Sequence, residues 1–264
     1  MPLTLLTWNV QGRNGLDVAA VAARIQAIGA GLVLLQEVTA SQAARVASAL
    51  SWPPAQWFRK HDPVLKAAEG LAVLGVEPMD AVHEHVLRPA PIWSSRRRIA
   101  VIAQLRLDGT VVAIANTHLT PHGDESARLA EGDRLVDLLD RTGVPARVLA
   151  GDLNAGPTSP LLGALRARGL RDAWDERNAH APEPAGATNW TRGRREGRPP
   201  TQRIDHVLVS AALQVVDART VDPTAPGFDA YARLSDHLPV IARLVPQRAH
   251  GQEGDGLDNN GPSV

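Results

Sequence analysis

The chain has no cysteine among its 264 residues. This absence excludes disulfide bonds, thiolate–metal sites and a cysteine nucleophile. A bound metal must therefore be held by carboxylate, amide or imidazole groups, which favour hard ions. No apolar run approaches the roughly 18 residues of a membrane helix, so we expect no transmembrane segment. The start of the chain, MPLTLLTW, lacks the basic stretch and cleavage site of a secretory signal, and we therefore expect a cytoplasmic protein.

Lysine is scarce, and there is no excess of either charge. Lys60 and Lys66 are the only lysines, so arginine supplies the other 26 basic residues, balanced by 28 acidic ones. The zero net charge argues against a general nucleic-acid coat, but it leaves room for a local basic groove. We see no repeat and no internal boundary. We expect one domain over residues 1–246 and a disordered tail over 247–264, where Gly, Asn, Asp and Gln dominate.

Apolar runs and helical periodicities alternate along the chain in the manner of an α/β protein. The patterns predict strands over 3–9, 32–35, 71–74, 99–107, 111–117, 147–150, 207–209 and 240–244. They predict helices over 18–28, 41–50, 125–139 and 161–167, with Asp17 and Ser159 as N-caps. Residues 51–63 and 178–202 are predicted to be loops.

Polar residues stand where the predicted strands end or begin. They are Asn9, Glu37, Asn116-Thr117-His118, Asp152 with Asn154, Asp205 and Ser235-Asp236-His237. Any one of them alone is more typical of a turn than of a ligand. Polar groups at strand ends of an α/β protein converge on one rim, where ligands bind. Six such positions rich in carboxylate, amide and imidazole therefore predict a functional site there.

These positions lie in six short motifs that occur in a fixed order. The motifs are WNVQ at 8–11, QEV at 36–38, NTHL at 116–119, GDLN at 151–154, RIDH at 203–206 and SDHLP at 235–239. Together they resemble the endonuclease/exonuclease/phosphatase superfamily, which includes deoxyribonuclease I. The resemblance spans residues 3 to about 244. It implies a four-layer α/β sandwich, in which two mixed β-sheets pack face to face with helices on the outside.

The resemblance also implies a metal site. Glu37 corresponds to the principal ligand of a Mg²⁺ or Mn²⁺ ion, with Asn9 beside it and Asp236 near enough to contribute. A hard, largely hydrated cation needs only one or two carboxylates together with substrate oxygens.

Further residues of the motifs correspond to catalytic groups. Asp152 and Asn154 resemble the pair that positions and activates the attacking water, and His237 resembles the catalytic histidine that Asp205 orients. His118 resembles a second histidine that contacts the phosphate or protonates the leaving group, and we expect Asn116 in the same motif to bind substrate. Several relatives support that second histidine with a glutamate on the preceding strand. The corresponding stretch here, SSRRRI at 94–99, has no acid.

The expected activity is divalent-metal-dependent hydrolysis of phosphodiester bonds in DNA or RNA by a monomer. An arginine-rich loop, with Arg192, Arg194, Arg195 and Arg198, fits contacts with a phosphate backbone, but fits a solvated loop equally well. Trp52, Trp57 and Trp190 could stack on bases, but packing under loops is the expected role of at least two of them. One alternative is a phosphatase or phospholipase acting on inositol phosphates or phospholipids. A second alternative is a catalytically silent binding module on the same scaffold.

Overall fold

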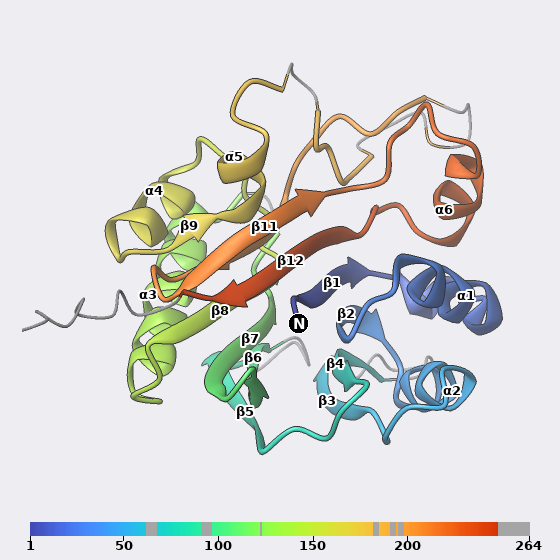
Figure 1. Cartoon of the computed structure of the whole chain (residues 1–264). Helices are drawn as coiled ribbons and strands as arrows, with labels where there is room; N and C mark the ends of the chain where they lie inside the picture. Colours follow the sequence, from blue (N-terminus) through green and yellow to red (C-terminus); the bar gives the residue numbers. More distant parts are fainter. Residues whose placement is uncertain are drawn as a thin grey trace, which may run out of the picture.

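The computed structural model describes residues 1–61, 68–90, 97–121, 123–181, 185–190, 194 and 198–247. Within them, strands form two mixed six-stranded β-sheets (Figure 1). The first sheet has the order β11-β12-β1-β2-β4-β3. Its strands are β1 Leu3–Asn9, β2 Leu32–Val38, β3 Gln56–His61, β4 Glu69–Gly75, β11 Leu213–Arg219 and β12 Val240–Pro246.

The second sheet has the order β5-β6-β7-β8-β10-β9. Its strands are β5 Ala81–Arg88, β6 Arg98–Leu107, β7 Thr110–His118, β8 Ala146–Asp152, β9 Arg171–Asp172 and β10 Asp205–Val209. The helices are a short 3₁₀ helix η1 Gly12–Asn14, α1 Val18–Ile28, α2 Ala40–Ala49, α3 Glu125–Asp140, α4 Pro160–Ala167, α5 Ala173–Arg177 and α6 Phe228–Leu234.

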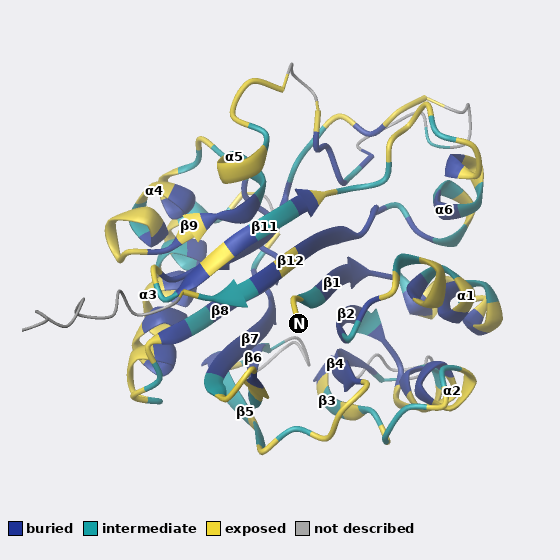
Figure 2. Ribbon diagram, viewed as in Figure 1, coloured by how far each residue is buried: buried dark blue, intermediate teal, exposed yellow. Residues whose placement is uncertain are grey.

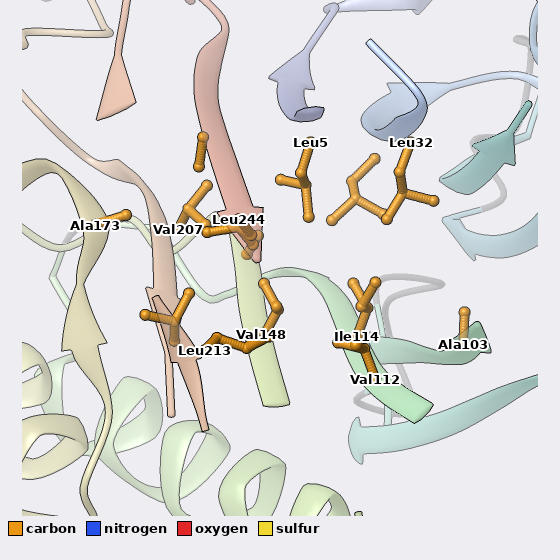
Figure 3. Close-up of a cluster of buried hydrophobic side chains, with 14 of the residues drawn as sticks. Leu5, Leu32, Ala103, Val112, Ile114, Val148, Ala173, Val207, Leu213 and Leu244 are labelled. Carbon is orange, nitrogen blue, oxygen red and sulfur yellow. The ribbon is translucent and has the colours of Figure 1, made fainter. Parts of the chain in front are cut away.

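Alternation along the strands builds the core between the two sheets. Successive side chains of a strand point to opposite faces, so every second apolar residue enters the same layer. Leu5 and Leu32 from the first sheet and Ile114 and Val148 from the second belong to one buried cluster. Figure 3 shows these side chains pointing toward each other across the space between the sheets.

The remaining apolar residues of the strands face the helices. Leu6 and Val33 pack with α1, α2 and α6 on the outside of the first sheet. Leu149 packs with α3 and α4 on the outside of the second sheet. The two groups of helices lie on opposite sides of the molecule, with exposed residues on their outer surfaces (Figure 2). The predicted four-layer α/β sandwich is confirmed.

Helix ends follow the predicted capping chemistry. The Asp17 carboxylate accepts from the Ala20 amide at 3.0 Å at the start of α1. The Ser159 hydroxyl accepts from the Leu162 amide at 3.3 Å at the start of α4. Each cap satisfies an amide that the first helical turn leaves without a backbone partner. No helix in the described part of the chain combines the length and the apolar character needed to span a membrane.

The sequence interpretation was wrong for part of the segment predicted as loop over 51–63. Residues Gln56–His61 form β3, an edge strand that pairs with β4 alone. Its polar residues hide the apolar alternation because an edge strand is only partly covered. Strands β5 and β11 were not predicted either, and β5 is also an edge strand with several half-exposed residues.

The topology gathers the polar strand ends at one edge of the sandwich. β1 runs parallel to β2, and β7 runs parallel to β8, so Asn9, Glu37, His118 and Asp152 stand near the same ends of their strands. β10 enters antiparallel to β8 with Asp205 paired directly to Asp152. The predicted rim of functional groups is therefore a consequence of strand direction.

Candidate active site

Residues from six strands and the adjoining segments line a cavity of about 240 Å³ at this edge. The predicted residues Glu37, His118, Asp152, Asn154 and His237 all line it. The remaining lining residues are Arg13, Lys60, His61, Glu69, Arg98 and Pro121. The residues that line the cavity are thus mostly acids, histidines and basic residues.

Asp152 is buried at the end of β8 and accepts two hydrogen bonds. Its Oδ2 accepts from Asn9 Nδ2 at 3.0 Å, and its Oδ1 accepts from the Asn154 amide at 3.0 Å. Burial and the nearby carboxylate of Asp205 raise the pKa of Asp152 to about 6. A carboxylate with such a pKa is a better proton acceptor than an ordinary aspartate.

Gly151 lets Asp152 take this place. Its φ is +139°, and a Cβ at this position would lie 2.0 Å from the Thr117 carbonyl oxygen of β7. Asn154 also has a left-handed backbone, with φ +50°, and its Nδ2 donates to the Leu119 carbonyl oxygen at 3.0 Å. The close approach of Gly151 to β7 and the left-handed backbone of Asn154 together hold the side chains of Asp152 and Asn154 at the cavity.

His237 is paired with a buried carboxylate. Its Nδ1 donates to Asp205 Oδ2 at 2.8 Å, and the Thr188 hydroxyl donates to the same oxygen at 2.6 Å. Burial alone would lower the pKa of His237, but Asp205 and then Asp152 together raise it to about 10. Asn189 Nδ2 lies 2.8 Å from Nε2 of the ring.

The segment before β12 fixes His237 against β1. The Ser235 hydroxyl donates to the Asn9 carbonyl oxygen at 2.7 Å and accepts from the His237 amide at 3.1 Å. The Trp8 indole donates to the His237 carbonyl oxygen at 2.9 Å. These bonds explain locally why serine stands two residues before the histidine, and why tryptophan precedes Asn9.

Glu37 is held in an unusual backbone conformation. Its φ is +54°, and the pairing of β2 with β4 shifts register between Gln36 and Val38. A bulge of this kind re-aims a side chain at the end of a strand, and a left-handed non-glycine residue is strained. The Glu37 carboxylate lies 3.8 Å from His118 Nδ1 and is partly exposed to the cavity.

Three other predicted residues lie beside the cavity or beneath it. Asn9 contacts Asp152, as described above, and the Asp236 carboxylate accepts from Gln11 Nε2 at 2.8 Å. Asn116 is fully buried between the sheets, where its Nδ2 donates to the Leu35 and Ala72 carbonyl oxygens. Its hydrogen-bonding capacity is used to join the two sheets, so we leave it out of the proposed site.

The described arginines of the basic loop and the three tryptophans do not line the cavity. Arg192 and Arg195 lie outside the described residues, and neither Arg194 nor Arg198 lines the cavity. Trp190 is only 6% exposed and packs against Phe228, so it is not available for stacking on a base.

The surroundings of His118 come from residues that the sequence interpretation missed. Lys60 Nζ lies 2.9 Å from His118 Nδ1, and Glu69 Oε1 lies 3.1 Å from the same ammonium. Residues 94–99 contain no acid that could support His118. Glu69 of β4 takes that place, and Lys60 connects it to the histidine. Of that stretch, residues 94–96 lie outside the described residues, and Arg98 donates to the His118 carbonyl oxygen at 3.3 Å. The signal in the sequence that could have drawn attention to Lys60 is the rarity of lysine in this arginine-rich chain.

The donor set fits a hard divalent cation. Asp152, Asp205 and His237 bring potential ligand atoms within 4.8 Å of one another. Asp205 and His237 are paired with each other, so the carboxylates of the proposed site that line the cavity and remain for a cation are those of Glu37 and Asp152. The raised pKa of Asp152 reflects repulsion between crowded carboxylates, which a cation would relieve. These donors therefore fit a hard divalent cation at this cavity.

The His237 environment predicts a pH-dependent stability. With a pKa raised from 6.5 to about 10, the folded protein binds this proton more tightly than the unfolded chain. The resulting stabilisation is complete below the unfolded value and is lost as the pH rises through about 10. We expect the free energy of unfolding of the metal-free wild type to fall more steeply from neutral to alkaline pH than that of His237→Gln. Urea denaturation at several pH values measures this difference.

The matched control is His180→Gln, because His180 is exposed. This control should follow the wild-type pH dependence. Parallel curves for the wild type and His237→Gln would contradict the assigned His237–Asp205 pairing.

Comparisons with known proteins show the family and the fold of the chain. A family model described as the Endonuclease/Exonuclease/phosphatase family matches residues 6–237. No curated protein matches the chain by sequence. An endonuclease/exonuclease/phosphatase from Bacteroides vulgatus is 18% identical with a TM-score of 0.74, and the match covers 94% of this chain and 100% of that one.

Two further solved structures share the fold. The human Nocturnin catalytic domain is 22% identical with a TM-score of 0.72, covering 93% of this chain and 94% of that one. A mannosyl-6-phosphatase from Bacteroides thetaiotaomicron is 19% identical with a TM-score of 0.71, and the match covers 92% of this chain and 99% of that one. At these identities the likeness concerns the fold. The family match extends from β1 to His237 and includes five of the six motifs and the first three residues of the sixth, and the chain belongs to the endonuclease/exonuclease/phosphatase family of phosphoester hydrolases.

Proposed function

We propose that the protein hydrolyses phosphodiester bonds of DNA or RNA by direct attack of water on phosphorus, with a divalent cation as cofactor. The observation that carries the proposal is the convergence of Glu37, Asp152, Asn154 and two histidines on one small polar cavity. Carboxylate, amide and imidazole groups are the side chains that phosphoryl transfer to water requires.

The side chains divide into a water-activating group and a phosphate-binding group. Asp152, with its raised pKa, accepts a proton from water that the Asn154 side chain helps to position. His237, cationic through Asp205, offers a proton or a charged hydrogen bond to a phosphoryl oxygen. Such preorganised donors act where negative charge increases in the transition state.

Glu37 is the principal metal ligand in this proposal, and the Asp152 carboxylate, which lines the same cavity, is a second candidate ligand. His237 is excluded as a ligand while it is protonated, because an imidazolium has no free lone pair. When bound, the cation would polarise the phosphoryl group and offset charge on the leaving oxygen.

A panel of substrates tests the proposal. The purified protein is assayed with Mg²⁺ and with Mn²⁺ on single- and double-stranded DNA, on RNA, on inositol phosphates, on phospholipids and on simple phosphomonoesters. Asp152→Asn protein prepared in parallel reports contaminating nucleases. Cleavage of nucleic acid by the wild type alone supports the proposal. Loss of every activity from the panel would favour the binding-module alternative.

A second candidate, hydrolysis of small phosphomonoesters, is favoured by the cationic side of the cavity. Arg13, Lys60 and Arg98 line it together, and the cavity is small, about 240 Å³. A terminal phosphate carries more negative charge than a diester and would gain more from three nearby cations. The fold neighbour named as a mannosyl-6-phosphatase is consistent with this candidate.

Replacing the principal metal ligand should weaken cation binding. We expect Glu37→Gln to lower Mn²⁺ affinity by at least about 10-fold, since even outer partners of metal ligands contribute 10–100-fold. Excess Mn²⁺ should restore part of the activity. Isothermal titration calorimetry measures the affinity without any substrate. The control is Glu77→Gln, which changes an exposed glutamate. Unchanged affinity in Glu37→Gln would assign the cation to other residues.

A further inference from the structure

A buried lysine contacts the second histidine of the cavity. Lys60 is 4% exposed at the end of β3, and its Nζ lies 2.9 Å from His118 Nδ1. Its ammonium is also 3.1 Å from Glu69 Oε1, and Arg13 lies 3.5 Å from the other oxygen of that carboxylate. Burial lowers the pKa of Lys60, and the Glu69 carboxylate opposes that shift, so the ion pair holds the lysine as an ammonium.

The chemistry of the ammonium fixes the direction of the contact with His118. An ammonium group has three donors and no acceptor, so the imidazole nitrogen that faces it must accept. Nδ1 of His118 therefore carries no proton, and the proton of the neutral ring lies on Nε2.

The two histidines of the cavity are consequently held in opposite ways. Asp205 accepts from Nδ1 of His237, whereas Lys60 donates to Nδ1 of His118. A carboxylate partner favours an imidazolium, and an ammonium partner favours a neutral ring. Environments that separate two titratable groups in this manner assign them different tasks.

Nε2 of His118, the ring nitrogen that does not contact Lys60, faces the cavity. Nε2 lies 3.6 Å from Asp152 Oδ2, and the cavity between them is also lined by Asn154. A ring locked with its proton on Nε2 can donate to an oxygen there, but cannot take a proton from water at that atom.

We infer that Lys60, held by Glu69, is a positioning residue that fixes His118 as its Nε2–H tautomer, so that His118 is a neutral hydrogen-bond donor to the phosphoryl group. The part of this inference that concerns the phosphoryl group rests on the proposed function. The tautomer itself does not.

Nuclear magnetic resonance tests the tautomer without substrate or metal. Long-range ¹H–¹⁵N correlations of the ¹⁵N-labelled wild type distinguish protonated from unprotonated ring nitrogens, and His118→Ala assigns the signals by their loss. We expect His118 to show a protonated Nε2 and an unprotonated Nδ1. A proton on Nδ1, or on both nitrogens, would overturn the inference.

Variants of Lys60 separate positioning from general support of the fold. In Lys60→Met the Glu37 carboxylate, 3.8 Å from Nδ1, is left as the nearest charged partner of that nitrogen, and we expect the proton to move to Nδ1. Lys60→Arg keeps a cationic donor and should keep the wild-type tautomer. An unchanged tautomer in a folded Lys60→Met protein would contradict the role of Lys60. If that variant fails to fold, the wild-type and Lys60→Arg spectra still test the inference, because a proton on Nδ1 of His118 in either protein would contradict it.

A double-mutant cycle tests whether Lys60 acts through His118. On the best substrate of the panel we expect Lys60→Met and His118→Ala each to lower kcat by about 10²-fold, the loss typical of one transition-state donor. The kcat of the double variant should be no lower than that of the slower single variant, and KM should change little. Independent losses, with KM raised by Lys60→Met alone, would make Lys60 a direct phosphate ligand and overturn the positioning role. Should the panel show no activity, the proposed function fails while the spectra still test the tautomer.

Discussion

Asp152→Asn is expected to lower kcat by about 10³–10⁴-fold while the protein stays folded. The aspartate supplies the proton acceptor for water, and positioned general bases contribute about 10²–10⁴-fold. Asparagine keeps the size of the side chain and one oxygen that can accept from the Asn154 amide, but it cannot take a proton. Steady-state kinetics with saturating metal measures the loss, because any effect on metal affinity is then compensated.

The matched control for this variant is Asp133→Asn, which makes the same chemical change at an exposed position of α3. Its kcat should equal that of the wild type. A nearly active Asp152→Asn enzyme would remove the water-activating role from the GDLN motif and require a different base.

His237→Ala is expected to have a comparable effect, about 10²–10⁴-fold in kcat with little rescue by metal. The variant removes the charged donor and leaves the carboxylate of Asp205 buried without its imidazole partner. Circular dichroism and thermal denaturation are needed alongside the kinetics, because an unpaired buried carboxylate destabilises a protein. His180→Ala, at an exposed histidine, is the control.

Asp152 and His237 should act as one unit. His237 Nε2 lies 3.8 Å from Asp152 Oδ2, so both groups serve the same reacting centre. Groups that act together lose most of their effect with the first deletion, and the double variant should be barely slower than either single variant. Multiplicative losses would indicate that the two residues assist separate steps.

The strands and helices with strong periodicity could be predicted from the sequence. Residues Leu3–Asn9 form β1 with the expected bounds, and Asp17 begins α1 as expected. These segments are covered on both sides or amphipathic, so burial imposes a clear pattern on them. Edge strands such as β3 are half-covered, and their patterns are correspondingly weak.

The same difference explains what could be predicted of the site. Asp152, Asn154 and His237 occur in motifs directly attached to strands that the sequence reveals. Lys60 lies on the edge strand that was interpreted as a loop, and its partner Glu69 begins β4 before the predicted apolar run. The contacts of Lys60 with Glu69 and with His118 depend on how β3 pairs with β4 and on how the two sheets pack, which no local pattern encodes.

The burial of Trp190 could not be predicted from composition alone. Trp190 stands in a loop rich in glycine and arginine, where exposure is the usual expectation. In the structure its indole donates to the Arg198 carbonyl oxygen at 2.6 Å and the ring packs on α6. A loop residue becomes buried when tertiary contacts cover it, and this information is not carried by its neighbours in sequence.

The most direct test of the central claim is a crystal structure with Mn²⁺ and inorganic phosphate, in which anomalous scattering locates the metal. The account predicts a manganese peak at the Glu37 carboxylate and a phosphate between His118, Asn154 and His237. A manganese ion bound to the His237 ring and Asp205, or a phosphate elsewhere on the surface with no metal in this cavity, would contradict it.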